Sequence, residues 1–233
     1  MDKTAIRNAA TVVLVRDAAT APRVLMGQRG SKAAFMPDRF VFPGGAVDAG
    51  DAFVPMAEPL PDGCLARIDE RSVPGLGPAL AAAAIRELWE ETGLALGLPG
   101  IWSGDVPEDW LGFAGAGFVP AAGALSFVFR AITPPGRPRR FDARFFVADV
   151  AAVQGDPDDF SRASGELGHL QWIPLERVRE FHLPFVTEVV LAEVAAALPD
   201  LGPPETVPFF DNGAEESLFR RLGGVGPMQG YGG

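Results

Sequence analysis

Residues 86–94 read Arg-Glu-Leu-Trp-Glu-Glu-Thr-Gly-Leu, and this stretch carries most of the information in the chain. It places Glu87, Glu90 and Glu91 at positions i, i+3 and i+4, which share one face of an α-helix. Three neighbouring carboxylates repel each other, and a hard divalent cation relieves that repulsion. Mg²⁺ and Mn²⁺ prefer carboxylate oxygens and are commonly shared with substrate phosphates. A solvated acidic helix face is the alternative interpretation.

The flanking residues favour a helix and a glycine turn before it. Pro78 suits a first helical turn, the alanine-rich segment 79–84 favours helix, and Gly93 suits a helix end. Upstream, residues 40–45 read Phe-Val-Phe-Pro-Gly-Gly, which is typical of a strand that ends in a turn. Glycine lets the backbone approach a ligand closely and frees a carbonyl to bind a metal. The sequence therefore predicts a metal-bearing helix beside a glycine turn.

Taken together, these segments resemble the Nudix hydrolase family. The family motif is a Gly, five residues, a Glu, seven residues, and then Arg-Glu-U-x-Glu-Glu-x-Gly-U, where U is a bulky aliphatic residue. Gly45 opens the motif, and residues 86–94 match its second half without a mismatch. The resemblance covers residues 8–198 and implies an α/β fold, an α/β/α sandwich with a mixed β-sheet.

The first half of the motif departs from the family pattern. Asp51 stands where the first Glu is expected, and thirty-four residues rather than seven separate it from Arg86. Either an insertion over residues 52–78 splits the motif and Asp51 takes the Glu role, or that role is empty. The insertion is favoured because this segment has five prolines, three glycines and no sustained period. A split motif resembles the branch that includes a peroxisomal coenzyme A diphosphatase.

The resemblance implies a role for each matching residue. The implied metal ligands, for Mg²⁺ or Mn²⁺, are Glu87, Glu90, Glu91 and the carbonyl of Gly44. Glu166 lies six residues before Trp172, as an additional Glu does in several Nudix enzymes, so either Glu91 or Glu166 is the general base. Arg86 would orient the glutamates.

Two further residues are assigned to substrate. Arg144 lies in an alternating strand pattern over residues 140–148, from which it points either into the site, to pair with phosphate, or into a structural ion pair. Gly45 is expected to contact substrate through its backbone.

The implied activity is metal-dependent hydrolysis of a diphosphate linkage in a nucleoside diphosphate derivative, including coenzyme A or its acyl esters. A Nudix-fold sensor that binds a nucleotide metabolite without cleaving it is the alternative, although a pure binder has less need of three metal carboxylates. A Nudix-fold isomerase acting on a prenyl diphosphate would require a catalytic cysteine. The single cysteine, Cys64, lies within the insertion, which is a poor place for that role.

Composition sets the outer bounds. The chain has 233 residues, a formal net charge of −10 and no long Lys/Arg block, which excludes a nucleic-acid surface. No apolar run approaches a membrane span, and one cysteine fits a reducing compartment, so we expect a cytoplasmic protein with no membrane partner. A homodimer is expected from the family resemblance. We expect a Nudix domain over residues 1–200 and a Gly/Pro-rich extension over 201–233.

Hydrophobic periodicity predicts the remaining elements. The segment 97–123 is expected to be a loop with a short helix near residues 107–111. The expected strands cover residues 10–15, 23–28, 38–43, 140–148, 171–174 and 207–210, and the expected later helices cover residues 175–181 and 184–198.

Overall fold

The computed structural model describes residues 5–31, 36–213 and 217–223. Within these residues a nine-stranded mixed sheet runs in the order β10-β2-β1-β8-β7-β11-β12, with β3 paired to β2 and β4 paired to β1. Its strands are β1 (Ile6–Arg16), β2 (Arg23–Arg29), β3 (Phe40–Val41), β4 (Gly44–Ala46), β7 (Ser126–Ile132), β8 (Arg140–Asp149), β10 (Leu167–Pro174), β11 (Val207–Asp211) and β12 (Leu218–Leu222).

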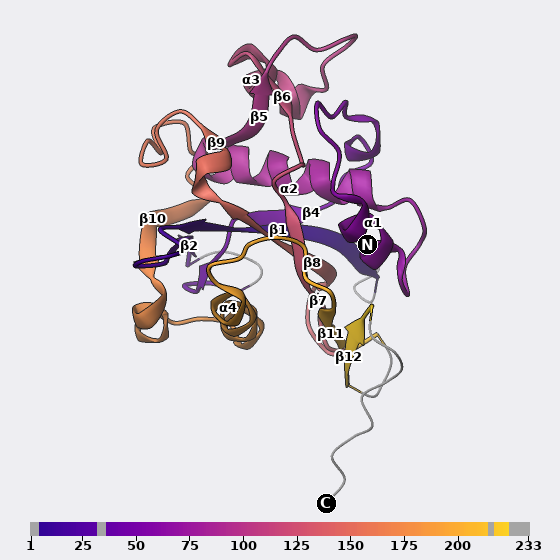
Figure 1. The fold of residues 1–233 in the computed structure, drawn as a ribbon, viewed down its shortest axis with the longest axis vertical. Helices are drawn as coiled ribbons and strands as arrows, with labels where there is room; N and C mark the ends of the chain where they lie inside the picture. The colour runs from indigo at the N-terminus through magenta and orange to yellow at the C-terminus, as the bar shows by residue number, and fades with distance from the viewer. Residues whose placement is uncertain (1–4, 32–35, 214–216, 224–233) are drawn as a thin grey trace, which may run out of the picture.

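One helix covers each face of this sheet, as Figure 1 shows for α2 (Gly77–Thr92) above it and α4 (Phe185–Ala197) below it. Alternate residues of β1 pack on opposite faces of the sheet. Val12 and Leu14 belong to the core under α2, whereas Val13 and Val15 belong to the core under α4. Both faces are buried, so the strand reads as a continuous apolar run. The predicted α/β/α sandwich is confirmed.

The helix α2 begins and ends as expected. A proline lies in its first turn, where the missing N–H costs no hydrogen bond. Gly93 ends the helix in the left-handed conformation with φ +79°, and its N–H donates to the Trp89 carbonyl at 2.8 Å. A Cβ at this position would be strained, which explains glycine here.

The segment predicted to be an insertion, residues 52–78, is more ordered than its composition indicates. The short 3-10 helix η1 (Asp51–Phe53) lies at its start, and the helix α1 (Asp62–Asp69) lies within it. Leu60, Cys64 and Ile68 are buried in the core under α2. The Phe127 N–H donates to the Cys64 sulfur at 3.3 Å, which joins α1 to β7. The insertion is therefore part of the domain core.

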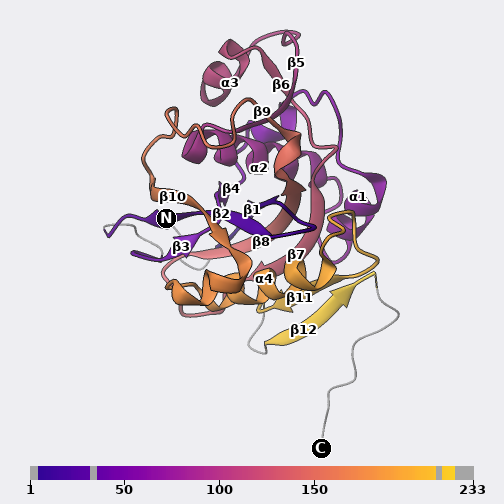
Figure 2. The same cartoon turned by 60° about the vertical axis from the view of Figure 1, so that its left-hand side comes forward.

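The prediction of a loop over residues 97–123 is wrong in part. β5 (Ala95–Pro99) pairs with β6 (Phe118–Pro120) and β9 (Val153–Gln154) in a second, three-stranded sheet. Between them lie η2 (Glu108–Trp110) and α3 (Leu111–Gly115), close to the short helix that was predicted. The aromatic rings of Trp110 and Phe113 are buried against each other, and they join this segment to the core under α2. Figure 2 shows it beyond α2, far from α4.

Other differences are local. The strand predicted over residues 38–43 is shorter, since only β3 at residues 40–41 lies within it. A separate strand, β4, follows Pro43, which lacks an N–H for a continuous ladder. The helix predicted over 175–181 is the 3-10 helix η4 (Leu175–Glu180), and another 3-10 turn, η3 (Val150–Ala152), follows β8. β12 was not predicted.

The main sheet continues past the predicted boundary at residue 200. β11 lies parallel to β7, and β12 pairs antiparallel with β11 at the edge of the sheet. The last part of the predicted extension, residues 224–233, lies outside the described residues. No helix within the described part of the chain is both long and apolar enough to cross a membrane.

Candidate functional site

The acidic face of α2 lies directly against the glycine turn. The Gly44 N–H donates to Glu91 Oε2 at 2.8 Å. A Cβ on Gly45 would overlap the Glu87 carboxylate, and a Cβ on Gly44 would lie 2.6 Å from the Ala10 carbonyl oxygen. Both glycines are therefore required by close approach. The structure brings together the two segments that the sequence singled out.

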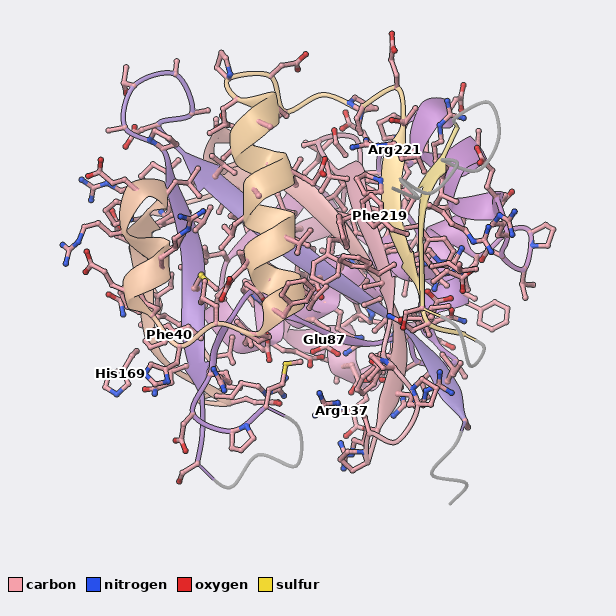
Figure 3. All side chains as sticks on the ribbon, turned by 90° about the horizontal axis from the view of Figure 1, so that it is seen from below. Phe40, Glu87, Arg137, His169, Phe219 and Arg221 are labelled. Atoms are coloured by element: carbon pink, nitrogen blue, oxygen red, sulfur yellow. The ribbon has the colours of Figure 1, made fainter. Side chains whose placement is uncertain are left out.

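The three glutamates have different surroundings. The Glu91 residue is 2% exposed, whereas the side chains of Glu87 and Glu90 are 14% and 36% exposed. Glu91 thus lies deepest, next to the turn, and Glu90 lies nearest to solvent. His169 is exposed at the periphery of the molecule and well separated from Glu87, as Figure 3 shows.

Burial makes the charged form of these carboxylates unfavourable. It raises the pKa of Glu91 to about 8, against the hydrogen bond from the Gly44 N–H, and the charge of Glu87 adds to the increase. It also raises the pKa of Glu87 to about 7, opposed by Arg86. The pKa of Glu90 is raised in the same way. Such a group of carboxylates is stabilised by a nearby positive charge.

Arg86 supplies one such charge. Its Nε donates to Asp51 Oδ1 and its Nη2 to Asp51 Oδ2, both at 3.1 Å. Nη2 also donates to the Ala46 carbonyl at 3.0 Å, and Nη1 donates to Glu87 Oε1 at 3.0 Å. Burial opposes the charge of Arg86, but the hydrogen bonds to Asp51 and the charges of Glu87 and Asp51 raise its pKa above the usual value. Arg86 thus joins the glycine turn, the start of the insertion and the acidic face.

Asp51 is itself held in place. It is 3% exposed, and its Oδ2 also accepts the Asp48 N–H at 2.8 Å. Its two oxygens match the guanidinium fork of Arg86, which is a strong and directional arrangement. The carboxylate that ends the first half of the motif therefore contacts the arginine that begins the second half. Contact occurs although thirty-four residues separate them in the chain.

Glu166 lies in the loop before β10 and approaches the same site from the neighbouring strand. Its Oε1 accepts from Arg29 Nη2 at 2.9 Å, and its side chain is 59% exposed. The charge of Glu166 adds to the raised pKa of both Glu87 and Glu91. Its loop contacts α2 directly, since the Ser164 N–H donates to the Glu90 carbonyl at 2.9 Å. The sequence predictions missed Arg29. The available signal was a basic residue at the end of a buried strand, directly before a glycine.

Arg144 lies in a different cluster. Its Nη1 donates to Asn8 Oδ1 at 2.7 Å and to the Asp142 carbonyl at 2.8 Å, and its Nη2 donates to Ser72 Oγ at 2.8 Å. Asp142 also pairs with Arg130 at 2.7 Å, and Arg130 donates to two carbonyls at the end of α1. The residue is 1% exposed, and burial lowers the pKa of its guanidinium to about 10. These contacts anchor the insertion to the sheet, which is the structural alternative weighed for Arg144.

The donor set suits a hard divalent cation. Three carboxylates, of which that of Glu91 is buried, lie beside a glycine turn in which a larger residue would displace one of them. Across the described residues, however, no group of three or more His, Cys, Asp or Glu side chains is arranged to hold a metal ion. Glu87 is engaged by Arg86 and Glu91 by the Gly44 N–H. Each of these contacts uses one carboxylate oxygen, Glu87 Oε1 and Glu91 Oε2, and leaves the second oxygen of each side chain for a cation.

Comparisons with known proteins agree with this geometry. No protein-family model matches the chain. The chain is 31% identical over 187 residues to a Caenorhabditis elegans protein described as putative nudix hydrolase 7, across 75% of this chain and 54% of that protein. It thus spans about half the length of this relative.

Solved structures extend the comparison. A NUDIX hydrolase from Alicyclobacillus acidocaldarius is similar with a TM-score of 0.60 and 28% identity, over 86% of this chain and 98% of the other. A C. elegans Ap4A hydrolase has a TM-score of 0.46 and 17% identity, over 82% and 96% of the two chains, a level that says nothing about substrate. The likeness to the A. acidocaldarius structure shows that this chain has the fold of a NUDIX hydrolase.

Proposed function

We propose that this protein is a pyrophosphohydrolase that cleaves a diphosphate linkage in a nucleoside diphosphate derivative, with Mg²⁺ or Mn²⁺ bound. The observation that carries this proposal is the buried Arg86–Asp51 pair, which fixes the acidic face of α2 against the glycine turn. A rigid arrangement of this kind is what a phosphate-bound cation needs, because small displacements of catalytic groups are costly. The likeness to NUDIX hydrolases supports the same reaction.

Glu87, Glu90, Glu91 and the Gly44 carbonyl are the proposed ligands. The cation, when bound, neutralises the diphosphate and lowers the pKa of a bound water. Arg86 keeps Glu87 in place through their 3.0 Å contact and does not need to touch substrate. Because Gly45 has no side chain, the Glu87 carboxylate can lie directly against the glycine turn.

Two carboxylates can accept the proton of the attacking water. Glu91 is buried and has a raised pKa, which suits proton transfer near neutral pH until a cation lowers it. Glu166 is more exposed and reaches the site from the loop before β10. Replacing a general base lowers kcat by about 10²–10⁴-fold. Glu91→Gln should abolish turnover in either case, so the kcat of Glu166→Gln decides between the two.

The substrate proposal is coenzyme A or an acyl-coenzyme A. It rests on the position of the insertion, which separates the two halves of the motif as in the branch that includes a coenzyme A diphosphatase. The structure places α1 of this insertion in the core under α2.

The test is product analysis on a diphosphate panel with Mg²⁺ or Mn²⁺. The panel contains coenzyme A, acetyl-coenzyme A, ADP-ribose, NADH, diadenosine polyphosphates and nucleoside triphosphates. We expect cleavage by the wild type, loss in Glu91→Gln, and full activity in Glu188→Gln, which changes an exposed glutamate of α4 on the other face of the sheet. Cleavage of another member of the panel would reject coenzyme A as the substrate but would leave the proposed reaction in place. Tight binding without cleavage of any member would favour the sensor alternative and overturn the proposal.

A further inference from the structure

Arg29 has hydrogen-bonding capacity that the described structure does not use. It is the last residue of β2, and its strand partner is Leu167, the residue after Glu166. Nη2 of Arg29 donates to Glu166 at 2.9 Å, while its Nε is buried and has no acceptor among the described residues. A buried donor without an acceptor costs free energy, so a ligand that accepts this hydrogen bond is favoured.

The pair lies beside the acidic face of α2. The Ser164 N–H, two residues before Glu166, donates to the Glu90 carbonyl of α2 at 2.9 Å, so the loop that carries Glu166 contacts this helix. Nη2 of Arg29 is engaged by Glu166, while its Nε has no acceptor among the described residues.

The loop that carries Glu166 is held on both sides, so its side chain can turn while the backbone stays. The Ser164 N–H donates to the Glu90 carbonyl at 2.9 Å. Further back, Asp158 pairs with Arg16 at 3.0 Å, and the Trp172 indole donates to the Pro157 carbonyl at 3.3 Å. The Glu166 side chain is 59% exposed. A rotation of one exposed side chain is enough to change its partner.

We propose that Arg29 acts as a latch with two alternative partners. Without substrate it holds Glu166 in the 2.9 Å ion pair. When a diphosphate substrate arrives with its cation, the Arg29 guanidinium turns to a phosphate oxygen, and Glu166 is released to the cation or its bound water. Arg29 is thus a positioning residue for Glu166 and a binding residue for substrate. This inference rests on the proposed function of the site.

The relative strengths of the two contacts favour the exchange. An ion pair with an exposed carboxylate is weak, whereas a guanidinium binds phosphate through two parallel hydrogen bonds. The unused Nε of Arg29 adjoins Nη2, so the two can form such a fork on one phosphate. Every charge keeps an opposite partner during the exchange. Glu166 gives up its contact with the guanidinium of Arg29 and gains a contact with the metal cation.

The test is a double-mutant cycle on Mn²⁺ affinity, measured by electron paramagnetic resonance without substrate. Arg29→Gln should tighten Mn²⁺ binding by about two- to fivefold, the range that corresponds to the loss of an exposed ion pair. In the Glu166→Gln background the same change should have less than half of that effect, because no carboxylate remains to be released. Equal tightening in both backgrounds would show simple removal of a positive charge and would overturn the latch.

Arg16→Gln is the matched control. Arg16 pairs with Asp158 of the same loop, and the exposures of the two side chains, 20% and 61%, nearly equal those of Arg29 and Glu166, 22% and 59%. This change should leave Mn²⁺ affinity within a factor of two. A shift as large as that of Arg29→Gln would show that loop anchoring, and not the latch, controls the site.

A second measurement tests the substrate partner. Arg29→Gln should raise KM for the cleaved diphosphate by about tenfold, which is 1.4 kcal/mol, and Arg29→Lys should restore part of it. An unchanged KM would overturn the phosphate contact. The Mn²⁺ cycle needs no substrate, so failure of the latch is seen there. A wild-type protein that cleaves no diphosphate would instead count against the proposed function.

Discussion

Asp51→Asn is the most direct test of how the split motif is held together. Asp51 accepts two hydrogen bonds from Arg86 and one from the Asp48 N–H, and both side chains of the ion pair are almost fully buried. Asparagine keeps the shape of the side chain but removes its charge. It also turns one acceptor into an NH₂ donor, which then faces another donor.

The expected loss of stability is about 3 kcal/mol. Breaking a buried ion pair by removal of one partner costs about 3–5 kcal/mol because the other charge stays buried. Arg86 keeps Glu87 at 3.0 Å and the Ala46 carbonyl at 3.0 Å, so the lower end of that range applies. For a chain of this length, ~3 kcal/mol corresponds to a decrease in Tm of about 6–12 °C.

Urea unfolding followed by the fluorescence of the four tryptophans measures this change. The control is Asp48→Asn, since Asp48 also approaches Arg86, at 3.5 Å, but its side chain is 54% exposed. The control should shift the free energy of unfolding by less than about 0.5 kcal/mol. Equal, small effects of the two variants would refute the claim that Asp51 fixes Arg86.

Two further predictions concern close packing. Gly45→Ala should lower activity and Mn²⁺ affinity at least tenfold, because its Cβ would displace the Glu87 carboxylate. Gly50→Ala, with open space around the new Cβ, should change neither. Equal effects of the two variants in a metal titration would contradict this prediction. Burial raises the pKa of the Cys64 thiol, so a thiol reagent at pH 8 should label it only after unfolding. The thiol pKa is higher in the folded state than in the unfolded state. The contribution of Cys64 to stability should therefore fall as pH rises above its unfolded pKa of about 8.5. Cys64→Ala should remove that pH dependence.

Spacing along the chain was sufficient to predict the central parts of the site. The i, i+3, i+4 pattern of Glu87, Glu90 and Glu91 defines a helix face, and the Gly93 turn defines its end, because both depend only on helix geometry and local backbone preference. The apolar run over residues 10–15 likewise predicted a strand, and the structure shows that both of its faces are buried.

Residues whose roles depend on distant partners could not be assigned in this way. Arg144 alternates correctly for a residue that faces the site, yet its partners Asn8 and Ser72 come from segments more than seventy residues away. The segment 97–123 looked irregular because its strands are short and pair with each other and with β9. Such pairing leaves little periodicity in the sequence.

The sequence by itself determined which helix carries the carboxylates and where the glycine turn lies, since these follow from local spacing. Only the tertiary structure decided that Asp51 contacts Arg86 across the insertion, that α1 completes the core, and that Arg29 meets Glu166. These contacts join residues far apart in the chain, and chain folding alone brings them within hydrogen-bonding distance. Their energies depend on burial, which is a property of the packed molecule.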